Sequence, residues 1–175
     1  MKDMMLLVEP LIPSLRRYAR SLLRDQAAAD DLVQDCLERV ICRWHQRRAD
    51  GDARTWVFTI LHNLAINRLK QVARRGRHVM IEDADDTVLA RPATQEDGWR
   101  QRDLQKGLAA LPEDQRSVLL LVSVEDLSYA EAAKVLGIPV GTVMSRLARA
   151  REKLMKTMDG ENVITLHPPN IRRVK

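Results

Sequence analysis

The segment from Leu127 to Arg151 constrains the fold more than any other part of the chain, because it carries the start and stop signals of consecutive helices. Ser128 and Glu131 have the spacing of a capping box, in which each side chain bonds the backbone N–H of the other residue. This pair predicts a helix that starts at Tyr129. Gly137 follows where that helix should end, since glycine adopts the left-handed backbone of a helix C-cap without steric cost.

A second, amphipathic helix is predicted directly after Pro139 and Gly141. Its apolar residues recur at helical spacing and should be buried: Val143, Leu147, Ala150 and Leu154. Its opposite face carries the polar and basic residues Thr142, Ser145, Arg146, Arg149 and Lys153. Two helices joined by a short turn are what a helix-turn-helix DNA reader requires, with arginine suited to guanine edges and hydroxyl groups to phosphate. The structural alternative is a solvated basic helix face.

The first half of the chain also reads as helical. Apolar residues at helical spacing define a helix from Leu11, and nothing between Glu9 and Asp52 alternates with period two. A second helix begins near Ala28, with the buried face Leu32, Val33, Cys36, Leu37, Val40, Ile41 and Trp44. A third begins at about Ala53, with the core face Trp56, Val57, Ile60, Leu61, Leu64 and Leu69. For Trp56 we favour a core position over a base-stacking role, because its apolar neighbours extend the same face.

The second and third predicted helices carry opposite charges. The polar side of the second helix carries Asp31, Gln34, Asp35 and Glu38 at helical spacing. The far end of the third becomes basic, with Arg68, Lys70, Arg74, Arg75 and Arg77. Because the net charge of the chain is only +5, the clustering of the basic residues, more than the total, indicates a polyanionic partner.

These patterns predict an all-α protein of two small helical domains joined by a flexible acidic linker. The first domain is assigned to residues 1–75 and the second to residues 99–158. Between them, residues 76–98 are rich in acidic side chains and lose apolar periodicity. Helical signals resume at Trp99, and the tail 159–175, with adjacent prolines, should be loosely ordered.

Composition argues against several functions. Cys36 and Cys42 point in different directions on a helix, which suits neither a disulfide framework nor a metal site. The histidines lack companions at ligand spacing, so we expect no metal, no cofactor and no catalytic residues. The longest apolar run, Val118 to Val122, is far shorter than a membrane span, and no signal peptide opens the chain. We therefore expect a cytoplasmic protein without membrane insertion.

At its second domain the chain resembles the extracytoplasmic-function sigma factors of RNA polymerase, since SYAEAAKVLGIPVGTVMSRLARARE is similar to their region-4 helix-turn-helix. The first domain resembles the same family, because AADDLVQDCLERVICRW is similar to region 2.2 and DARTWVFTILHNLAINRLKQVARR to regions 2.3 and 2.4. The family differs in the recognition helix, where many relatives carry arginine and an aromatic residue and this chain has Met144 and Ala148. Its −35 preference therefore cannot be copied from them.

The resemblance implies a transcription initiation factor that binds core RNA polymerase and directs it to promoter DNA. Region 2.2 then docks on the polymerase through Asp31, Gln34, Asp35 and Glu38, where a solvated helix face is the alternative. The resemblance also implies that the −10 element is contacted by Arg48, Asp50, Asp52, Asn63, Asn67, Arg68, Lys70, Arg74 and Arg75. The alternatives are a surface amide without a function for Asn63 and a solubilising role for some of the basic residues. The −35 element is contacted by Thr142, Ser145, Arg146, Arg149 and Lys153.

Members of this family are commonly controlled by an anti-sigma protein, so the resemblance also implies such a partner and a role in a stress or environmental response. The acidic linker has a family counterpart that threads toward the active centre, and a plain spacer is the equal alternative. A different class remains open: a free-standing helix-turn-helix regulator, which would normally dimerise on a palindrome. An enzyme acting on nucleic acid would need a metal or general-base cluster, which we do not find in the sequence.

Overall fold

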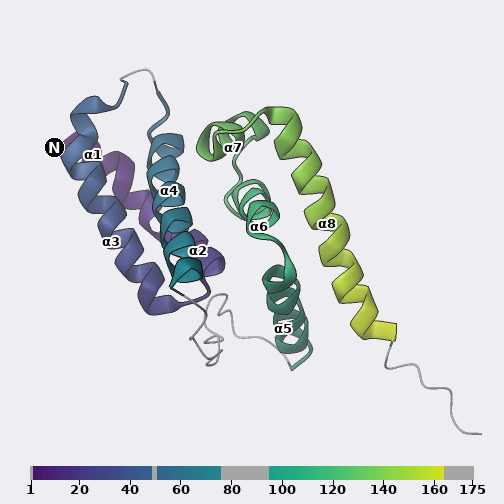
Figure 1. Cartoon of the computed structure of the whole chain (residues 1–175). Coiled ribbons are helices and arrows are strands. Elements are labelled where there is room, and N and C mark those ends of the chain that lie inside the picture. Colours follow the sequence, from purple (N-terminus) through teal and green to yellow (C-terminus); the bar gives the residue numbers. More distant parts are fainter. Residues whose placement is uncertain (1, 49–50, 76–94, 164–175) are drawn as a thin grey trace, which may run out of the picture.

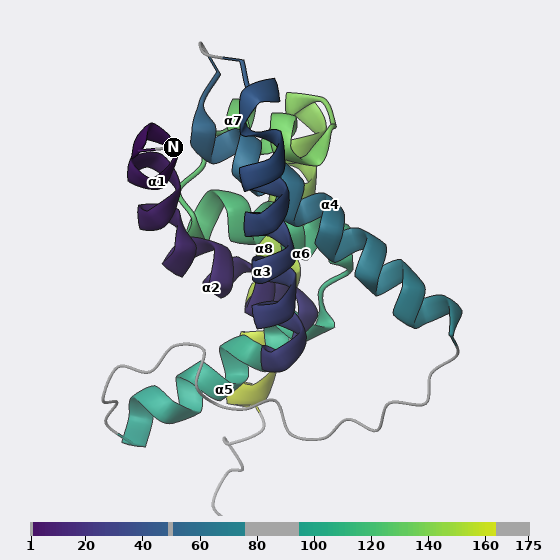
Figure 2. The same cartoon turned by 90° about the vertical axis from the view of Figure 1, so that its left-hand side faces the viewer.

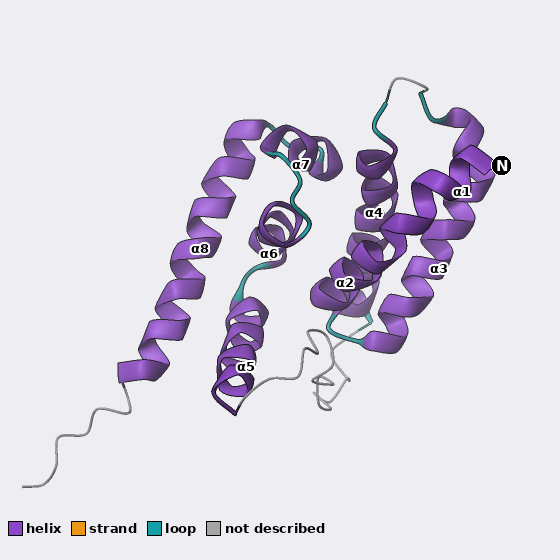
Figure 3. Cartoon of the chain, turned by 180° about the vertical axis from the view of Figure 1, so that it is seen from behind, coloured by secondary structure: helices purple, strands orange, loops and turns teal. Residues whose placement is uncertain are grey.

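The computed structural model describes residues 2–48, 51–75 and 95–163 (Figure 1). Within these ranges the chain consists of helices and short turns, without a β-strand (Figure 3). The predicted all-α class is therefore confirmed. The predicted acidic linker falls mostly on residues 76–94, which lie outside the described part of the chain.

The first helical unit is a bundle whose core is built around aromatic and leucine side chains. Its elements are α1 (Lys2–Val8), η1 (Glu9–Leu11), α2 (Ile12–Leu23), α3 (Gln26–Arg43), η2 (Trp44–Gln46) and α4 (Ala53–Arg74). Tyr18, Phe58 and Leu61 have no exposed surface, and the ring centroids of Tyr18 and Phe58 lie 5.8 Å apart in an edge-to-face arrangement. Helix α1 is an element that the apolar pattern from Leu11 onward did not predict.

Local capping sets the starts of two of these helices. The carboxylate of Asp25 accepts the backbone N–H of Ala28 at 2.8 Å, so α3 begins at Gln26, slightly before the predicted start. The carboxylate of Asp52 accepts the backbone N–H of Thr55 at 2.8 Å and the hydroxyl of the same residue at 2.6 Å. Helix α4 accordingly begins at Ala53, which confirms the predicted start.

The predicted buried face of α3 needs one correction. Val33, Cys36 and Val40 are buried, whereas Ile41 is 58% exposed. One residue beyond Val40, the helix has rotated by about 100° away from the core, so the side chain of Ile41 points to solvent. The prediction that Ile41 is buried was therefore wrong.

The second helical unit contains α5 (Gln95–Ala110), α6 (Glu113–Leu119), the π-helix η3 (Leu120–Val124), α7 (Tyr129–Leu136) and α8 (Val140–Val163). Helix α8 packs against α5, α6 and α7. Gly107 of α5 lies against Leu154 of α8, since a Cβ at this position would lie 2.5 Å from Cδ1 of that leucine and would displace the end of its side chain. The capped helix at Tyr129 and the following helix confirm the predicted helix-turn-helix.

Three boundaries of the second unit differ from the sequence prediction. Helix α8 begins at Val140, so Gly141, which was predicted to precede this helix, lies in its first turn. Helix α5 begins at Gln95, before Trp99, where helical signals were expected to resume. Helix α8 continues to Val163, so the start of the predicted tail is helical. The acidic and glycine residues at these positions weaken a helical pattern, but each extends a helix already begun or soon to begin. Residues 164–175 are outside the described part.

The two units are in contact. Helix α4 packs against α7, and α2 packs against α6 and η3. Helices α6 and α7 therefore lie between the first unit and α8 (Figure 1). The C-terminal part of α4 extends beyond the neighbouring helices (Figure 2). The buried residues of both units form one cluster, so the interface continues the core.

Candidate nucleic-acid and polymerase interfaces

The predicted cap residues set where α7 begins and where it ends. The backbone N–H of Ser128 donates to Oε2 of Glu131 at 2.7 Å, and the N–H of Glu131 donates to the hydroxyl of Ser128 at 3.2 Å. Gly137 ends α7 with a φ of 64°, in the left-handed region that glycine enters freely. These contacts confirm the capping box at the start of α7 and the glycine stop at its end.

The structure separates the two faces of α8 as predicted. Val143, Leu147 and Ala150 are buried, and Leu154 packs against the core partly buried. The predicted −35 set lies on the other side, with Ser145, Arg149 and Lys153 exposed and Thr142 and Arg146 half-buried. This face therefore presents hydroxyl, guanidinium and ammonium groups together, which suits the edges and phosphates of a DNA major groove.

Arg146 differs from its neighbours on this face because it has an acidic partner. Its Nε lies 3.3 Å from Oδ2 of Asp114, in the first turn of α6. The side chain of Arg146 is 30% exposed and that of Asp114 is 48% exposed. Sequence reasoning selected Arg146 but not Asp114, because the pairing depends on how α6 packs against α8.

Helix α4 carries a polar stripe along its outer side. Asn63, Asn67, Lys70 and Arg74 recur at helical spacing and are all exposed. Arg68 is half-buried beside this stripe, and Arg75 is exposed where the helix ends. The structure thus brings these six predicted −10 residues onto one basic and amide-rich helix.

The loop before α4 holds the remaining predicted −10 residues. Arg48 is exposed, and Asp50 lies outside the described residues. The carboxylate of Asp52 caps α4, and its hydrogen bonds to Thr55 and Arg54 lower the pKa of that carboxyl despite partial burial. Asp52 therefore has a structural role as the N-cap of α4, and its contact with DNA stays a prediction.

Trp56 belongs to an aromatic cluster at this end of the bundle. Its ring centroid lies 5.9 Å from that of Trp44 in an edge-to-face arrangement, and both side chains pack against the core. The guanidinium of Arg47 covers the ring of Trp44 at 4.8 Å and donates to the carbonyl of Gly51 at 2.6 Å. This arrangement confirms the predicted core position of Trp56.

The predicted polymerase-docking residues lie on the outer side of α3. Asp31, Gln34, Asp35 and Glu38 are all exposed. The amide of Gln34 donates to Glu38 at 3.3 Å along the helix. The opposite side of α3 is in the core, so this acidic face is open to a partner.

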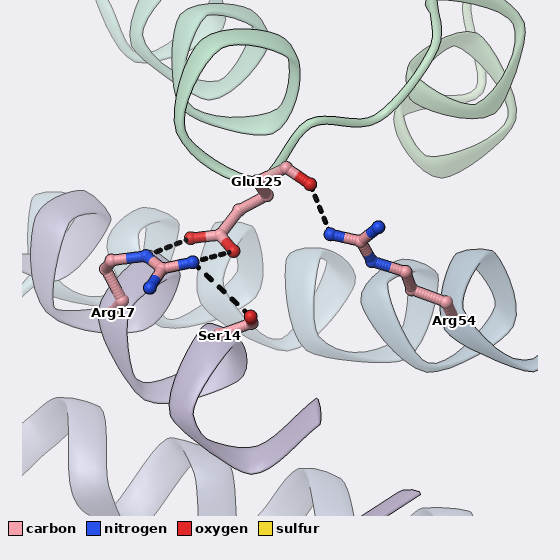
Figure 4. A network of polar contacts seen from close by, with 4 residues as sticks. All are labelled: Ser14, Arg17, Arg54 and Glu125. Carbon is pink, nitrogen blue, oxygen red and sulfur yellow. Dashed lines mark hydrogen bonds and ion pairs between the residues drawn. The ribbon is translucent and has the colours of Figure 1, made fainter. Parts of the chain in front are cut away.

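Polar contacts to the buried Glu125 join the two helical units, and we name Arg17, Arg54 and Glu125 the interdomain latch (Figure 4). Arg17 on α2 donates through Nε and a terminal nitrogen to the two carboxylate oxygens of Glu125, at 2.8 and 2.7 Å. Arg54 on α4 donates to the backbone carbonyl of the same residue. The side chain of Glu125 has no exposed surface, and its hydrogen bonds raise the pKa of Arg17.

The π-helix η3 places Glu125 in the latch. The backbone N–H of Glu125 donates to the carbonyl of Leu120 at 3.0 Å, a bond that spans five residues instead of four. Asp126 then turns the chain with a φ of 51°, a left-handed conformation that aspartate tolerates better than most residues. No local sequence signal indicated this interface, because Glu125 lies 108 positions from Arg17 and 71 from Arg54.

The first unit also buries a titratable pair. The hydroxyl of Tyr18 and Nδ1 of His62 are 2.9 Å apart in a hydrogen bond. Burial raises the pKa of Tyr18 and lowers the pKa of His62 to about 4, so the imidazole is neutral at neutral pH. Burial likewise raises the pKa of the Cys36 thiol to about 12, which leaves it protonated.

Two features are absent among the residues that the structure describes. No group of three or more histidine, cysteine, aspartate or glutamate side chains is arranged there to hold a metal ion. Among the described helices, none combines the length and the apolar character that crossing a membrane requires.

Family comparisons match both units. Residues 8–62 match the family described as the Sigma2 domain of PhyR, and residues 101–154 match Sigma-70, region 4. The structure is similar to the sigma factor RpoE, solved in complex with the anti-sigma factor NepR from Bartonella quintana. The TM-score is 0.77 at 30% identity, over 91% of this chain and 98% of that one.

Curated relatives agree with these matches. The chain is 36% identical over 146 residues to the ECF RNA polymerase sigma factor EcfG of Rhodopseudomonas palustris, covering 82% of this chain and 78% of the relative. It is 35% identical over 148 residues to the ECF RNA polymerase sigma factor SigC of Mycobacterium tuberculosis, covering 81% and 76%. With the helix-turn-helix of α7 and α8 and the region-2 bundle in place, the chain belongs to the extracytoplasmic-function sigma factors of RNA polymerase.

Proposed function

We propose that this protein binds core RNA polymerase as a sigma factor, directs it to specific promoters, and acts in the cytoplasm without catalytic residues of its own. The observation that carries the proposal is the presence of two separate polar helix faces, on α4 and on α8, in units that match sigma regions 2 and 4. One face alone would make a simple DNA-binding domain. Two faces, together with a third and acidic face on α3, fit a factor that joins polymerase to DNA.

In this proposal the domains keep the boundaries 1–75 and 99–158, and each surface has one ligand. The −10 element is contacted by the polar stripe of α4 and by the loop before it, and the −35 element by the outer face of α8. Arginine and lysine at the end of α4 supply phosphate affinity, which carries salt dependence but no sequence information. The acidic face of α3 docks on the polymerase, where it does not meet the like charge of DNA.

The contact between the units limits what the free protein can do. The names of the two promoter elements place them about 25 base pairs apart, which is roughly 85 Å on straight B-DNA. Helices α4 and α7 touch, so the closed arrangement cannot place α4 and α8 on both elements together. We infer that the polymerase holds the two units apart, and that the interdomain latch opens when it does.

Control by an anti-sigma protein is also part of the proposal. The solved relative RpoE was crystallised with the anti-sigma factor NepR, and it shares 30% of its sequence with this chain. A stress-response sigma factor held by a similar protein is the corresponding role here. Affinity purification of the tagged chain from unstressed cells should then recover a small partner in addition to polymerase subunits. Recovery of polymerase alone under all growth conditions would contradict this part.

The test of the main function is transcription in vitro with core polymerase from a related bacterium, on pooled genomic fragments, with RNA 5′ ends mapped by sequencing. New starts that require the protein and share upstream motifs are expected. The alternative, a free-standing helix-turn-helix regulator, predicts no new starts, no binding to core polymerase, and tight binding of the free protein to a palindrome.

The acidic face of α3 gives a separate prediction. Reversing two charges with D35K and E38K should weaken binding to core polymerase about tenfold, since like charges then oppose the docking surface. Both side chains are exposed, so the fold should tolerate the change. Titration of labelled protein with core polymerase measures the effect.

A matched control is D3K with E9K, which reverses two exposed acidic side chains near the N-terminus. This control should leave the affinity for core polymerase within about twofold of wild type, because exposed charges away from the docking surface contribute little to binding. Equal losses in the two double variants would show that total charge, and not the face of α3, determines binding.

A further inference from the structure

The ion pair between Arg146 and Asp114 lies at the edge of the face that we assign to the −35 element. Arg146 follows the buried Val143 on α8 and precedes the buried Leu147, so its stem is held against the core and its head reaches the polar side. Asp114 approaches from α6, in the first turn, where Glu113 is the other acidic residue. A residue outside the helix-turn-helix thus contacts one of its predicted DNA-reading side chains.

The geometry of the pair leaves part of the guanidinium available. An arginine head is planar and has five N–H donors, one on Nε and two on each terminal nitrogen. Asp114 lies 3.3 Å from Nε of Arg146. A guanine in the major groove accepts two parallel hydrogen bonds, at O6 and N7, and the two terminal nitrogens of one arginine can donate them. The carboxylate and a guanine can therefore hold the same guanidinium at once, on different edges.

We propose that Asp114 is a positioning residue that orients Arg146 for base recognition and so helps to set the −35 preference. This inference rests on the proposed function and deepens it. Holding the guanidinium before DNA arrives reduces the side-chain entropy that is lost on binding. The same carboxylate repels phosphate, so it penalises placements in which Arg146 leaves it for the DNA backbone. Asp114 thereby favours base contacts over phosphate contacts.

The proposal predicts opposite changes in affinity and in selectivity. With D114N, Arg146 is free to bind phosphate and a negative charge is removed, so affinity for unrelated DNA should rise. Discrimination among −35 sequences should fall about three- to tenfold at the base pair that Arg146 reads. If the ion pair had only a structural role, D114N would change neither the affinity for unrelated DNA nor the discrimination among −35 sequences. The variant should fold normally, because surface ion pairs contribute little to folding.

The experiment uses holoenzyme reconstituted with the full chain and a promoter that it transcribes, with every single base-pair substitution in the −35 element. R146A identifies the base pair at which preference is lost. D114N should lose preference at that same pair, whereas D114E should restore most of it. The matched control E113Q removes the same charge from the same helical turn and should leave the preference unchanged.

Three results would overturn the inference: wild-type preference in D114N, an equal loss in E113Q, or a D114N loss at base pairs that do not depend on Arg146. Absence of transcription by the wild-type holoenzyme would instead contradict the proposed function. The outcomes are therefore separable. Circular dichroism and thermal melting of each variant show whether the fold is intact.

Discussion

Replacing Arg17 with methionine is expected to release the two helical units of the free protein from one another while each stays folded. The change leaves the carboxylate of Glu125 without its partner in a position with no exposed surface. Removing one member of a buried ion pair costs about 3 kcal/mol at the low end of measured values, and Arg17 is 37% exposed, which favours that end. Opening the interface hydrates the carboxylate, so the closed population should fall about 100-fold relative to the open one.

Fluorescence energy transfer between α3 and α8 measures this opening. Cys42 on α3 is exposed and accepts one dye, M155C supplies the second site on an exposed part of α8, and Cys36 is buried. Wild-type protein should give short distances that lengthen when core polymerase is added. R17M should give long distances without polymerase.

The control for this experiment is R16M. Arg16 precedes Arg17 on the same helix, is 57% exposed, and lies 4.0 Å from Asp30 within the first unit, so its loss removes the same charge without touching the interface. It should keep the short distances. If R17M also keeps them, the ion pair of Arg17 with Glu125 does not hold the units together, and the packing of α4 against α7 must do so instead.

We expect the protein to begin to lose stability on acidification near pH 6.5, which is above the pH range in which carboxylates titrate. His62 has a pKa of about 4 in the folded chain against 6.5 when solvated, because burial disfavours the imidazolium. The neutral form is the one that folds, so this contribution is complete above pH 6.5 and is lost as the pH falls toward 4. The free energy of unfolding should drop by about 2 kcal/mol between pH 7.5 and pH 5.

Urea unfolding at the two pH values tests this in wild type and in H62Q. Glutamine cannot take up a proton, so the drop should disappear in H62Q even if the variant is less stable at both pH values. H45Q replaces an exposed histidine and should retain the drop. A pH dependence that is unchanged in H62Q would assign the effect to other groups.

Much of the helix-turn-helix could be predicted from the sequence, because the residues that start and stop its first helix are close neighbours in the chain. Ser128 and Glu131 are three residues apart, and Gly137 ends the same helix, so neighbouring residues alone determine where α7 starts and stops. The start of α4 at Ala53 could be predicted for the same reason. The polar sets on α3, α4 and α8 follow from periodicity, which requires only the helix and one buried face.

The remaining features depend on contacts between distant residues. Asp114 reaches Arg146 only after α6 packs against α8, and Glu125 meets Arg17 only when the two units come together. Periodicity treated Ile41 as part of a wide apolar face, although the packed core is narrower than that face. The buried contact of His62 with Tyr18 could not be predicted either, because the two residues are 44 positions apart in the sequence.

The contact between Glu125 and Arg17 also depends on the number of residues in the π-helix η3. A π-helical turn accommodates one residue more than an α-helical turn, so η3 is equivalent to a single insertion in a continuous helix. Deleting one residue there would restore the regular spacing and rotate Glu125 by about 100°, away from Arg17, with every charge still present. Relatives with and without a closed interface would then differ in length by one residue at η3. A comparison of residue identities alone would overlook this difference in length.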